Sequence, residues 1–102
     1  MKRPEWDDFR EQDQRLCTLR VLAECPGYRS NEGSLQLALE TFGHVLSRAA
    51  MRGILHYLHD HHLASVEIVA QGSVYIATIR PLGLDVAAGR ETHPGVKRPA
   101  PK

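Results

Sequence analysis

The chain has 102 residues, of which 42% are hydrophobic and 25% charged, and its formal net charge at pH 7 is +1. This length accommodates one small domain with a modest core and excludes an enzyme with separate substrate and cofactor lobes. The balanced charge excludes a nucleic-acid binder that works through its net field alone, so a basic surface would need locally placed arginines.

The first predicted segments are a polar arm and a helix. Helical spacing of apolar residues begins near Phe9 and stops at Pro26 and Gly27. For Trp6, in the arm, we expect packing against the core, with contact to a partner as the alternative. The tail has three prolines and little to bury, so it is expected to be flexible or draped over the domain. The predicted divisions are a polar arm at 1–8, one domain at 9–89 and a Pro-rich basic tail at 90–102.

The cysteines and the hydropathy pattern indicate the compartment. Cys17 and Cys25 are eight residues apart in the first predicted helix, about 12 Å along its axis, which is too far for a disulfide. Free thiols are typical of a reducing compartment. No apolar run approaches the roughly 20 residues of a membrane span, and the N-terminus does not resemble a signal peptide. We therefore expect a cytoplasmic protein that is not inserted in a membrane.

Two further helices follow, joined by a short turn. The second is capped by Ser30 or Asn31 and ends at Gly43, which suits a left-handed terminal residue. Its predicted inward positions are Leu35, Ala38, Leu39 and Phe42. The third is capped by Ser47 and extends to His62. Its predicted inward positions are Ala50, Met51, Ile54, Leu55 and Leu58.

After Leu63 the spacing of apolar residues changes from a helical period to alternation. Val66 and Ile68 alternate with polar neighbours, and Val74 and Ile76 repeat this pattern after a turn at 70–73. Two β-branched runs around a short glycine-containing turn predict a β-hairpin. A short helix, LGLDVAAG, then ends at its last glycine.

This order of elements predicts an α+β, mostly helical fold: a winged helix-turn-helix with three helices, a two-stranded β-hairpin wing and a short C-terminal helix. Over residues 10–88 the chain resembles the winged helix-turn-helix superfamily of bacterial and phage transcriptional regulators. The closing IRPLGLDVAAGRETHPGVKRP is similar to the end of small winged-helix proteins of Mu-like prophages. The resemblance to the superfamily rests on Leu35, Leu39, Gly43, Ser47, Met51, Leu55, Leu58, Leu63 and the following hairpin.

The resemblance implies a small DNA-binding transcriptional regulator. The third helix would enter the major groove of double-stranded DNA, and the wing would contact the backbone. Arg48, Arg52, His56 and His59 follow one another at intervals of four, four and three, which places them on one outward stripe. The expected DNA-contacting residues are Ser47, Arg48, Ala49, Arg52 and His56 on the helix, with Gln71 and Ser73 on the wing. Such regulators are commonly dimers, so a homodimer is expected, with the first and last helices as candidate interfaces.

The alternative function is a winged-helix adaptor that binds protein rather than DNA. The charge of the outer face separates the two: a continuous positive patch favours DNA, whereas neutralisation by Glu32, Glu40 or Asp60 favours the adaptor.

Four of the six histidines lie in HYLHDHHL, at 56–63, which raises the alternative of a metal site at His56, His59 and His62. We expect this run to be mainly the end of a helix, because cations are favoured at helix C-termini. No glycine-rich phosphate loop is present. Cys17 lies in an apolar helix without an evident activating neighbour. We therefore expect no enzymatic activity, no cofactor and no small-molecule substrate.

Overall fold

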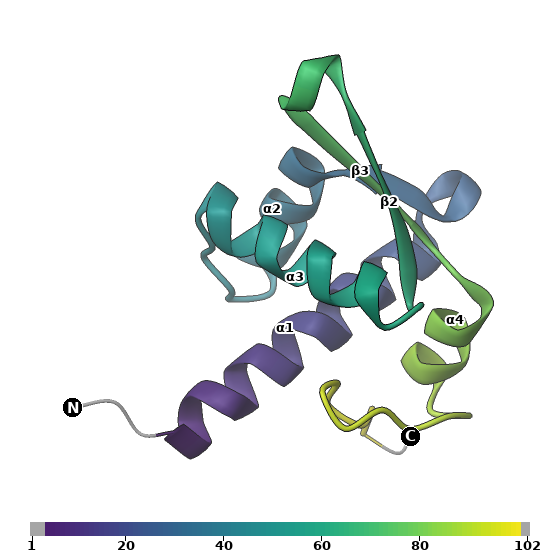
Figure 1. Cartoon of the computed structure of the whole chain (residues 1–102). Coiled ribbons are helices and arrows are strands. Elements are labelled where there is room, and N and C mark those ends of the chain that lie inside the picture. The colour runs from purple at the N-terminus through teal and green to yellow at the C-terminus, as the bar shows by residue number, and fades with distance from the viewer. Residues whose placement is uncertain (1–3, 101–102) are drawn as a thin grey trace.

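A computed structural model describes residues 4–100 of the chain. Within that range it contains four α-helices and a three-stranded antiparallel sheet, which confirms the predicted α+β, mostly helical class. The helices form one body, and the β2–β3 hairpin extends beyond it (Figure 1). The element bounds are α1 Pro4–Glu24, β1 Arg29–Asn31, α2 Glu32–Thr41, α3 Arg48–Asp60, β2 Ala64–Val69, β3 Val74–Ile79 and α4 Pro81–Ala88.

Helix α1 begins at Pro4 rather than near Phe9. A proline in the first turn and the acidic Glu5 and Asp7 both favour a helix N-terminus, so these polar residues form helix rather than an arm. The remainder of the predicted arm, residues 1–3, lies outside the described residues. Trp6 is 61% exposed, so its expected packing against the core was wrong.

The predicted caps of α2 and α3 and the predicted end of α2 are confirmed, whereas α3 ends at Asp60 rather than at His62. The Asn31 side chain accepts a hydrogen bond from the Ser34 amide at 2.8 Å, and Ser47 Oγ accepts one from the Ala50 amide at 3.0 Å. At the end of α2, Gly43 has φ +93°, and the His44 amide donates to the Leu39 carbonyl at 2.8 Å. This arrangement satisfies the last carbonyls of the helix and turns the chain toward α3.

The third strand, β1, was not predicted. It pairs with β3 through the registers Arg29↔Thr78, Ser30↔Ala77 and Asn31↔Ile76, so the sheet order is β1-β3-β2. The strand has no apolar residue, which is why alternation in the sequence did not reveal it. It forms because the segment just before α2 lies along the edge of β3 that β2 leaves free.

One core joins the three main helices to one face of the sheet. The predicted Leu35 and Leu39 are buried, whereas Phe42 at the end of α2 is 65% exposed and Ala50 on α3 is also exposed, which corrects two inward positions. On β3 the buried side chains are Ala77 and Ile79. The core consists of Leu16, Leu19, Leu22, Leu35, Leu39, Met51, Ile54, Leu55, Leu58, Leu63, Ala64, Ala77, Ile79, Val86 and Val96.

The C-terminal tail is draped over the domain, which was one of the two alternatives. Val96 is 5% exposed, and the Lys97 amide donates to the Gln12 carbonyl at 3.1 Å. Arg15 donates to the Gly95 carbonyl at 2.9 Å while its guanidinium lies 3.8 Å from the centre of the Tyr57 ring. The tail therefore belongs to the folded unit up to these residues, and residues 101–102 lie outside the description.

Gly83 allows α4 to approach the end of α3 closely. A Cβ atom at this buried position would overlap the Leu63 carbonyl and lie 2.8 Å from Cγ1 of Ile79. We expect Gly83→Ala to lower the free energy of unfolding by about 1–3 kcal/mol, because a packed core resists an added methyl group. Urea denaturation followed by circular dichroism measures this change.

The matched control is Gly53→Ala on α3, where an added Cβ meets no atom within 4 Å. There we expect stabilisation by about 0.5–1 kcal/mol from helix propensity. Equal effects of the two substitutions would contradict the close packing at Gly83.

Candidate nucleic-acid interface

The beginning of α3 presents the residues that were predicted to face DNA. Ser47 caps the helix, and Arg48 and Ala49 follow it, all with exposed side chains. Gly53 and His56 continue the exposed surface along the helix. The first turn of a helix carries unpaired amide groups and a partial positive charge, both of which favour an anion such as phosphate.

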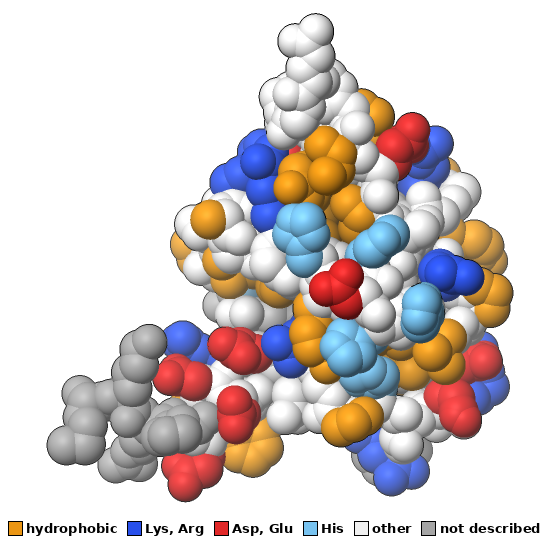
Figure 2. Space-filling view, viewed as in Figure 1, with side chains coloured by type: hydrophobic (Ala, Val, Ile, Leu, Met, Phe, Trp, Pro, Cys, Tyr) orange, Lys and Arg blue, Asp and Glu red, His pale blue; other side chains and the backbone are white. Residues whose placement is uncertain are grey.

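The β2–β3 hairpin lies beside α3, and its tip was predicted as the wing. Ala70 and Gln71 adopt positive φ angles of 52° and 56°, and Gly72 follows with φ 90°. Gln71 and Ser73 are exposed, as a contact with a partner would require. In the space-filling view a group of basic side chains lies next to the protruding hairpin, and histidines gather over α3 below it (Figure 2).

A buried carboxylate lies behind the two arginines. Glu32, the first residue of α2, is 1% exposed. Its Oε1 accepts a hydrogen bond from Nε of Arg52 at 2.6 Å, and its Oε2 accepts one from Nη2 at 2.9 Å. The backbone amide of Tyr75 on β3 also donates to Oε2, at 3.0 Å. Glu32 thereby connects α2, α3 and the sheet.

These contacts change the acidity of Glu32. The hydrogen bonds from the Arg52 guanidinium favour the ionised carboxylate and hold the pKa of Glu32 below its ordinary value, although burial opposes the shift. The Tyr75 amide and the positive charge of Arg48 act in the same direction. Glu32 is therefore a charged residue in the folded protein and neutralises part of the arginine cluster.

Arg52 is largely committed to contacts within the protein. Besides binding Glu32, it donates from Nη2 to the Ser73 carbonyl at 3.1 Å, and its guanidinium lies 4.3 Å from the centre of the Tyr75 ring. The Tyr75 hydroxyl in turn lies 3.2 Å from Nε2 of His56. Arg52 thus joins α3 to the end of the hairpin turn and the start of β3.

Arg48 is more accessible than Arg52. Its side chain is 51% exposed, against 28% for Arg52. Nη1 lies 3.4 Å from Oε2 of Glu32, and Nε donates to the side chain of Gln36. These contacts hold the guanidinium at the start of α3 while leaving half of the side chain available to solvent.

The structure brings Arg48, Arg52, His56 and Ser73 together through their contacts with Glu32 and Tyr75. Gln71 is exposed in the same hairpin turn as Ser73. Sequence reasoning recognised Glu32 as a possible neutralising charge but did not anticipate its burial or the contribution of Tyr75. The available signal was the position of Glu32 directly after the Asn31 cap, where a carboxylate is favoured but is usually solvated.

The histidines of the run at 56–62 lie in different surroundings. The His59 ring accepts a hydrogen bond from the Val66 amide through Nδ1 at 3.1 Å, and His62 follows the end of α3 with φ 62°. Among residues 4–100, no three histidine, cysteine or acidic side chains lie close enough to share a metal ion. His61 stacks on Tyr57 with ring centres 4.1 Å apart, which gives part of the run a packing role.

Cys17 remains a free thiol, as does Cys25. Partial burial raises the pKa of Cys17 above its ordinary value, and the nearby Asp13 acts in the same direction. Both effects disfavour the thiolate that a nucleophile requires. In the part of the chain that the structure describes, no helix is both long and apolar enough to cross a membrane.

Comparison with known proteins identifies the relatives of this chain. It is 38% identical over 96 residues to the uncharacterized protein gp26 of Escherichia phage Mu, which covers 94% of this chain and 97% of gp26. The chain belongs to the family of phage Mu gp26. An uncharacterized protein of Haemophilus influenzae is 41% identical over 61 residues, which are 60% of this chain and 59% of that protein.

Membership of the gp26 family confirms the expected relationship to a protein of a Mu-like phage. No protein-family model matches the chain, and neither does any solved structure. The order of helices and strands in this member of the family is compatible with a winged helix.

The Glu32 contacts predict a specific loss of stability. We expect Glu32→Gln to lower the free energy of unfolding at pH 7 by on the order of 2–3 kcal/mol, somewhat less than for a fully buried ion pair because Arg52 is partly solvated. Glu40→Gln, on an exposed position of the same helix, is the matched control and should change it by less than about 0.5 kcal/mol.

The pH dependence follows from the lowered pKa of Glu32. Its ionised form contributes stability that is fully present above the pKa of an unfolded glutamate, about 4.3, and is lost as the pH falls through the lower value in the folded protein. The difference between wild type and Glu32→Gln should therefore shrink below about pH 4. A difference that is constant from neutral to acidic pH would contradict an ionised, paired Glu32.

Proposed function

We propose that this member of the gp26 family binds double-stranded DNA, with the first turn of α3 in the major groove and the β2–β3 wing against the backbone. The observation that carries the proposal is that α3 and the wing form one exposed surface. Arg52 joins them through its bonds to Glu32 and to the Ser73 carbonyl. A major groove about 12 Å wide admits one helix, and an adjoining hairpin can then reach the phosphates.

In this proposal the two arginines have different roles. Arg48 is the DNA-contacting residue, because its guanidinium stands at the start of α3 with half of the side chain exposed. It would bind a guanine edge or a phosphate. Arg52 is a positioning residue, because its Nε and Nη2 donate to Glu32 and to the Ser73 carbonyl. It sets the angle between the recognition surface of α3 and the wing.

The first half of α3 supports close approach to a duplex. Ala49 and Gly53 are small and exposed, and a Cβ at position 53 would meet no protein atom within 4 Å. The alanine methyl suits contact with a thymine methyl, and His56 extends the same surface. With one buried carboxylate against two arginines, the cluster keeps a net positive charge at neutral pH, so binding should rely on a few phosphate contacts.

A second candidate function, a protein-binding adaptor, is favoured by two observations. Glu32 neutralises part of the arginine cluster, which is the condition that favours the adaptor. In addition, Leu37 on α2 and Val45 in the following turn are 66% and 79% exposed, which places apolar surface next to the proposed DNA-binding helix. Apolar groups at such positions are typical of contacts with proteins rather than with phosphates.

DNA binding is tested with the full chain and a fluorescently labelled duplex of mixed sequence, by anisotropy at about 50 mM and about 200 mM salt. We expect binding that weakens as the salt concentration rises, because phosphate contacts release counterions. Arg48→Ala should reduce the binding free energy by about 1–3 kcal/mol and, if the contact is to phosphate, lower the salt slope by about 1.

The matched control is Arg90→Ala, because Arg90 is also an exposed arginine in an ion pair, 2.9 Å from Asp85 at the far end of α4. Wild-type binding should be retained in this variant. Absence of binding at the lower salt concentration, or equal losses in the two variants, would overturn the DNA proposal and leave the adaptor. Circular dichroism of each variant establishes that it is folded.

A further inference from the structure

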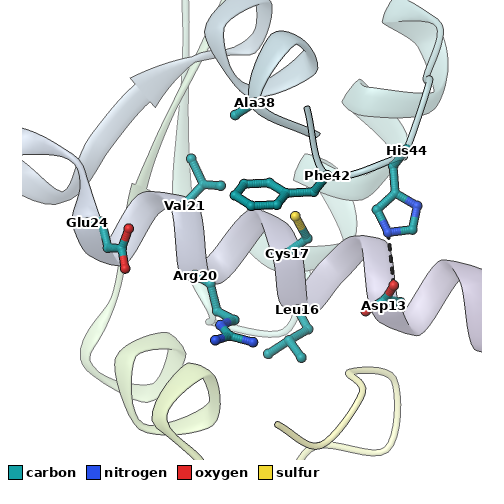
Figure 3. A pocket seen from close by; sticks show the side chains of 9 residues that line it. All are labelled: Asp13, Leu16, Cys17, Arg20, Val21, Glu24, Ala38, Phe42 and His44. Atoms are coloured by element: carbon teal, nitrogen blue, oxygen red, sulfur yellow. Dashed lines mark hydrogen bonds and ion pairs between the residues drawn. The ribbon is translucent and has the colours of Figure 1, made fainter. Parts of the chain in front are cut away.

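A groove runs along the seam between α1 and α2, on a part of the molecule that the proposed function does not use. Its volume is about 570 Å³. Val21 and Cys17 of α1 and Phe42 at the end of α2 line its apolar part, and the ring of Phe42 lies over α1 (Figure 3). Asp13, Arg20 and Glu24 add charged groups along its length. This groove is therefore an apolar surface with a charged border.

The same helix carries two large apolar side chains that the domain does not cover. Trp6 and Phe9 are 61% and 64% exposed and lie three residues apart near the start of α1. In Figure 1 this part of α1 projects beyond α2 and α3. Two exposed aromatic groups on a projecting helix end form a protrusion that is suited to a groove on another molecule.

The protrusion and the groove lie on one face of α1. Trp6, Asp13, Cys17 and Glu24 are separated by seven, four and seven residues, which returns each to nearly the same side of a helix. Phe9 and Arg20 repeat this relationship eleven residues apart on the adjoining row. Trp6 and Cys17 are separated by about 16 Å along the axis, at about 1.5 Å per residue.

We propose that two copies of this chain associate through antiparallel α1 helices, with Trp6 and Phe9 of each copy inserted in the groove of the other. A two-fold axis makes an interface self-complementary: if a protrusion fits a groove elsewhere on the same face, both contacts form at once. Here the axis falls midway between protrusion and groove, near Asp13. The interface consequently contains two copies of the same contact, each with the Trp6 and Phe9 side chains of one copy in the groove of the other.

Charge also favours a second copy as the occupant. The first two turns of α1 carry Glu5, Asp7 and Asp8 against one basic residue, Arg10, whose Nη2 lies 3.9 Å from Asp7. The antiparallel arrangement brings this predominantly acidic end toward Arg20 at the groove of the partner. The two Asp13 carboxylates approach each other near the axis. Each already has partners within its own chain: Nζ of Lys97 lies 3.6 Å from one carboxylate oxygen, and Nε2 of His44 lies 2.9 Å from the other.

Sedimentation equilibrium of the full chain, together with the emission of its single tryptophan, tests this association. We expect dimers, and an emission maximum that shifts to shorter wavelength with increasing protein concentration as Trp6 leaves water. The double substitution Trp6→Ala/Phe9→Ala should raise the dimer dissociation constant by about 100-fold or more, because aromatic residues dominate interface energies. Both residues are exposed, so the variant should retain the circular dichroism spectrum of the folded protein.

Leu37→Ala/Val45→Ala is the matched control, since it removes two equally exposed apolar side chains from the α2–α3 side. This variant should remain dimeric. A wild-type chain that is monomeric at high concentration, or dimers that persist equally in both double variants, would overturn the proposal. In the first case, the groove would be left for a different partner.

Charge reversal provides a second test that does not depend on truncating side chains. Arg20→Glu should weaken the dimer by placing like charges opposite the acidic end of the partner helix, and adding Glu5→Arg to the same chain should restore association. Arg98→Glu, an equal change of charge in the exposed tail, should have no effect. Equal effects of Arg20→Glu and Arg98→Glu, or no recovery in the combined variant, would contradict the antiparallel arrangement. DNA binding is measured separately, so either proposal can fail without the other.

Discussion

The buried carboxylate of Glu32 is the constraint on which the arrangement of the other elements depends. A charge removed from water is tolerated only where hydrogen bonds and an opposite charge replace its hydration, and here three donors do so. They come from Arg52 of α3 and from the backbone of Tyr75 on β3, while Glu32 itself begins α2. Displacing any of the three elements would remove at least one of these contacts, so one group holds their relative positions together.

The same constraint shapes the outer surface of the protein. Because Arg52 is held by Glu32, by the Ser73 carbonyl and by the Tyr75 ring, it gives the wing a defined position and contributes less free charge. Arg48 keeps half of its side chain in solvent. A surface with one accessible arginine, small residues and histidines differs from a strongly basic groove. It favours recognition through shape and a few directed contacts over attraction by net charge.

The two faces of the molecule are chemically distinct. The surface formed by α3 and the wing carries Arg48, Arg52 and most of the histidines, together with apolar side chains at the hairpin (Figure 2). The face formed by α1 and the end of α2 carries Trp6, Phe9 and Phe42, together with the groove. Self-association on the second face would leave the first free, which would allow a dimer of this gp26 relative to present two such surfaces to one partner.

Several elements were predictable from the sequence because their signals are local. Asn31 and Ser47 cap their helices as expected, and Gly43 and Gly89 end theirs in the left-handed conformation, since each choice depends on a residue's own backbone preferences. The amphipathic spacing of α3 likewise identified Met51, Leu55 and Leu58 as buried. Strand β1 escaped prediction because its three polar residues are strand only through pairing with β3.

The candidate site likewise has some features that local sequence signals predict and others that depend on tertiary contacts. The sequence by itself determined an α+β domain with a capped third helix, a hairpin after it, and Arg48 and Arg52 on an outward stripe, because periodicity and capping act over a few residues. Only the tertiary structure decided that Glu32 is buried beside both arginines, that Arg52 bonds to the wing, and that Trp6 and Phe9 remain uncovered. These outcomes depend on contacts between segments separated by about 20 to 40 positions, and the free energy of such contacts is set by burial and geometry that local patterns do not encode.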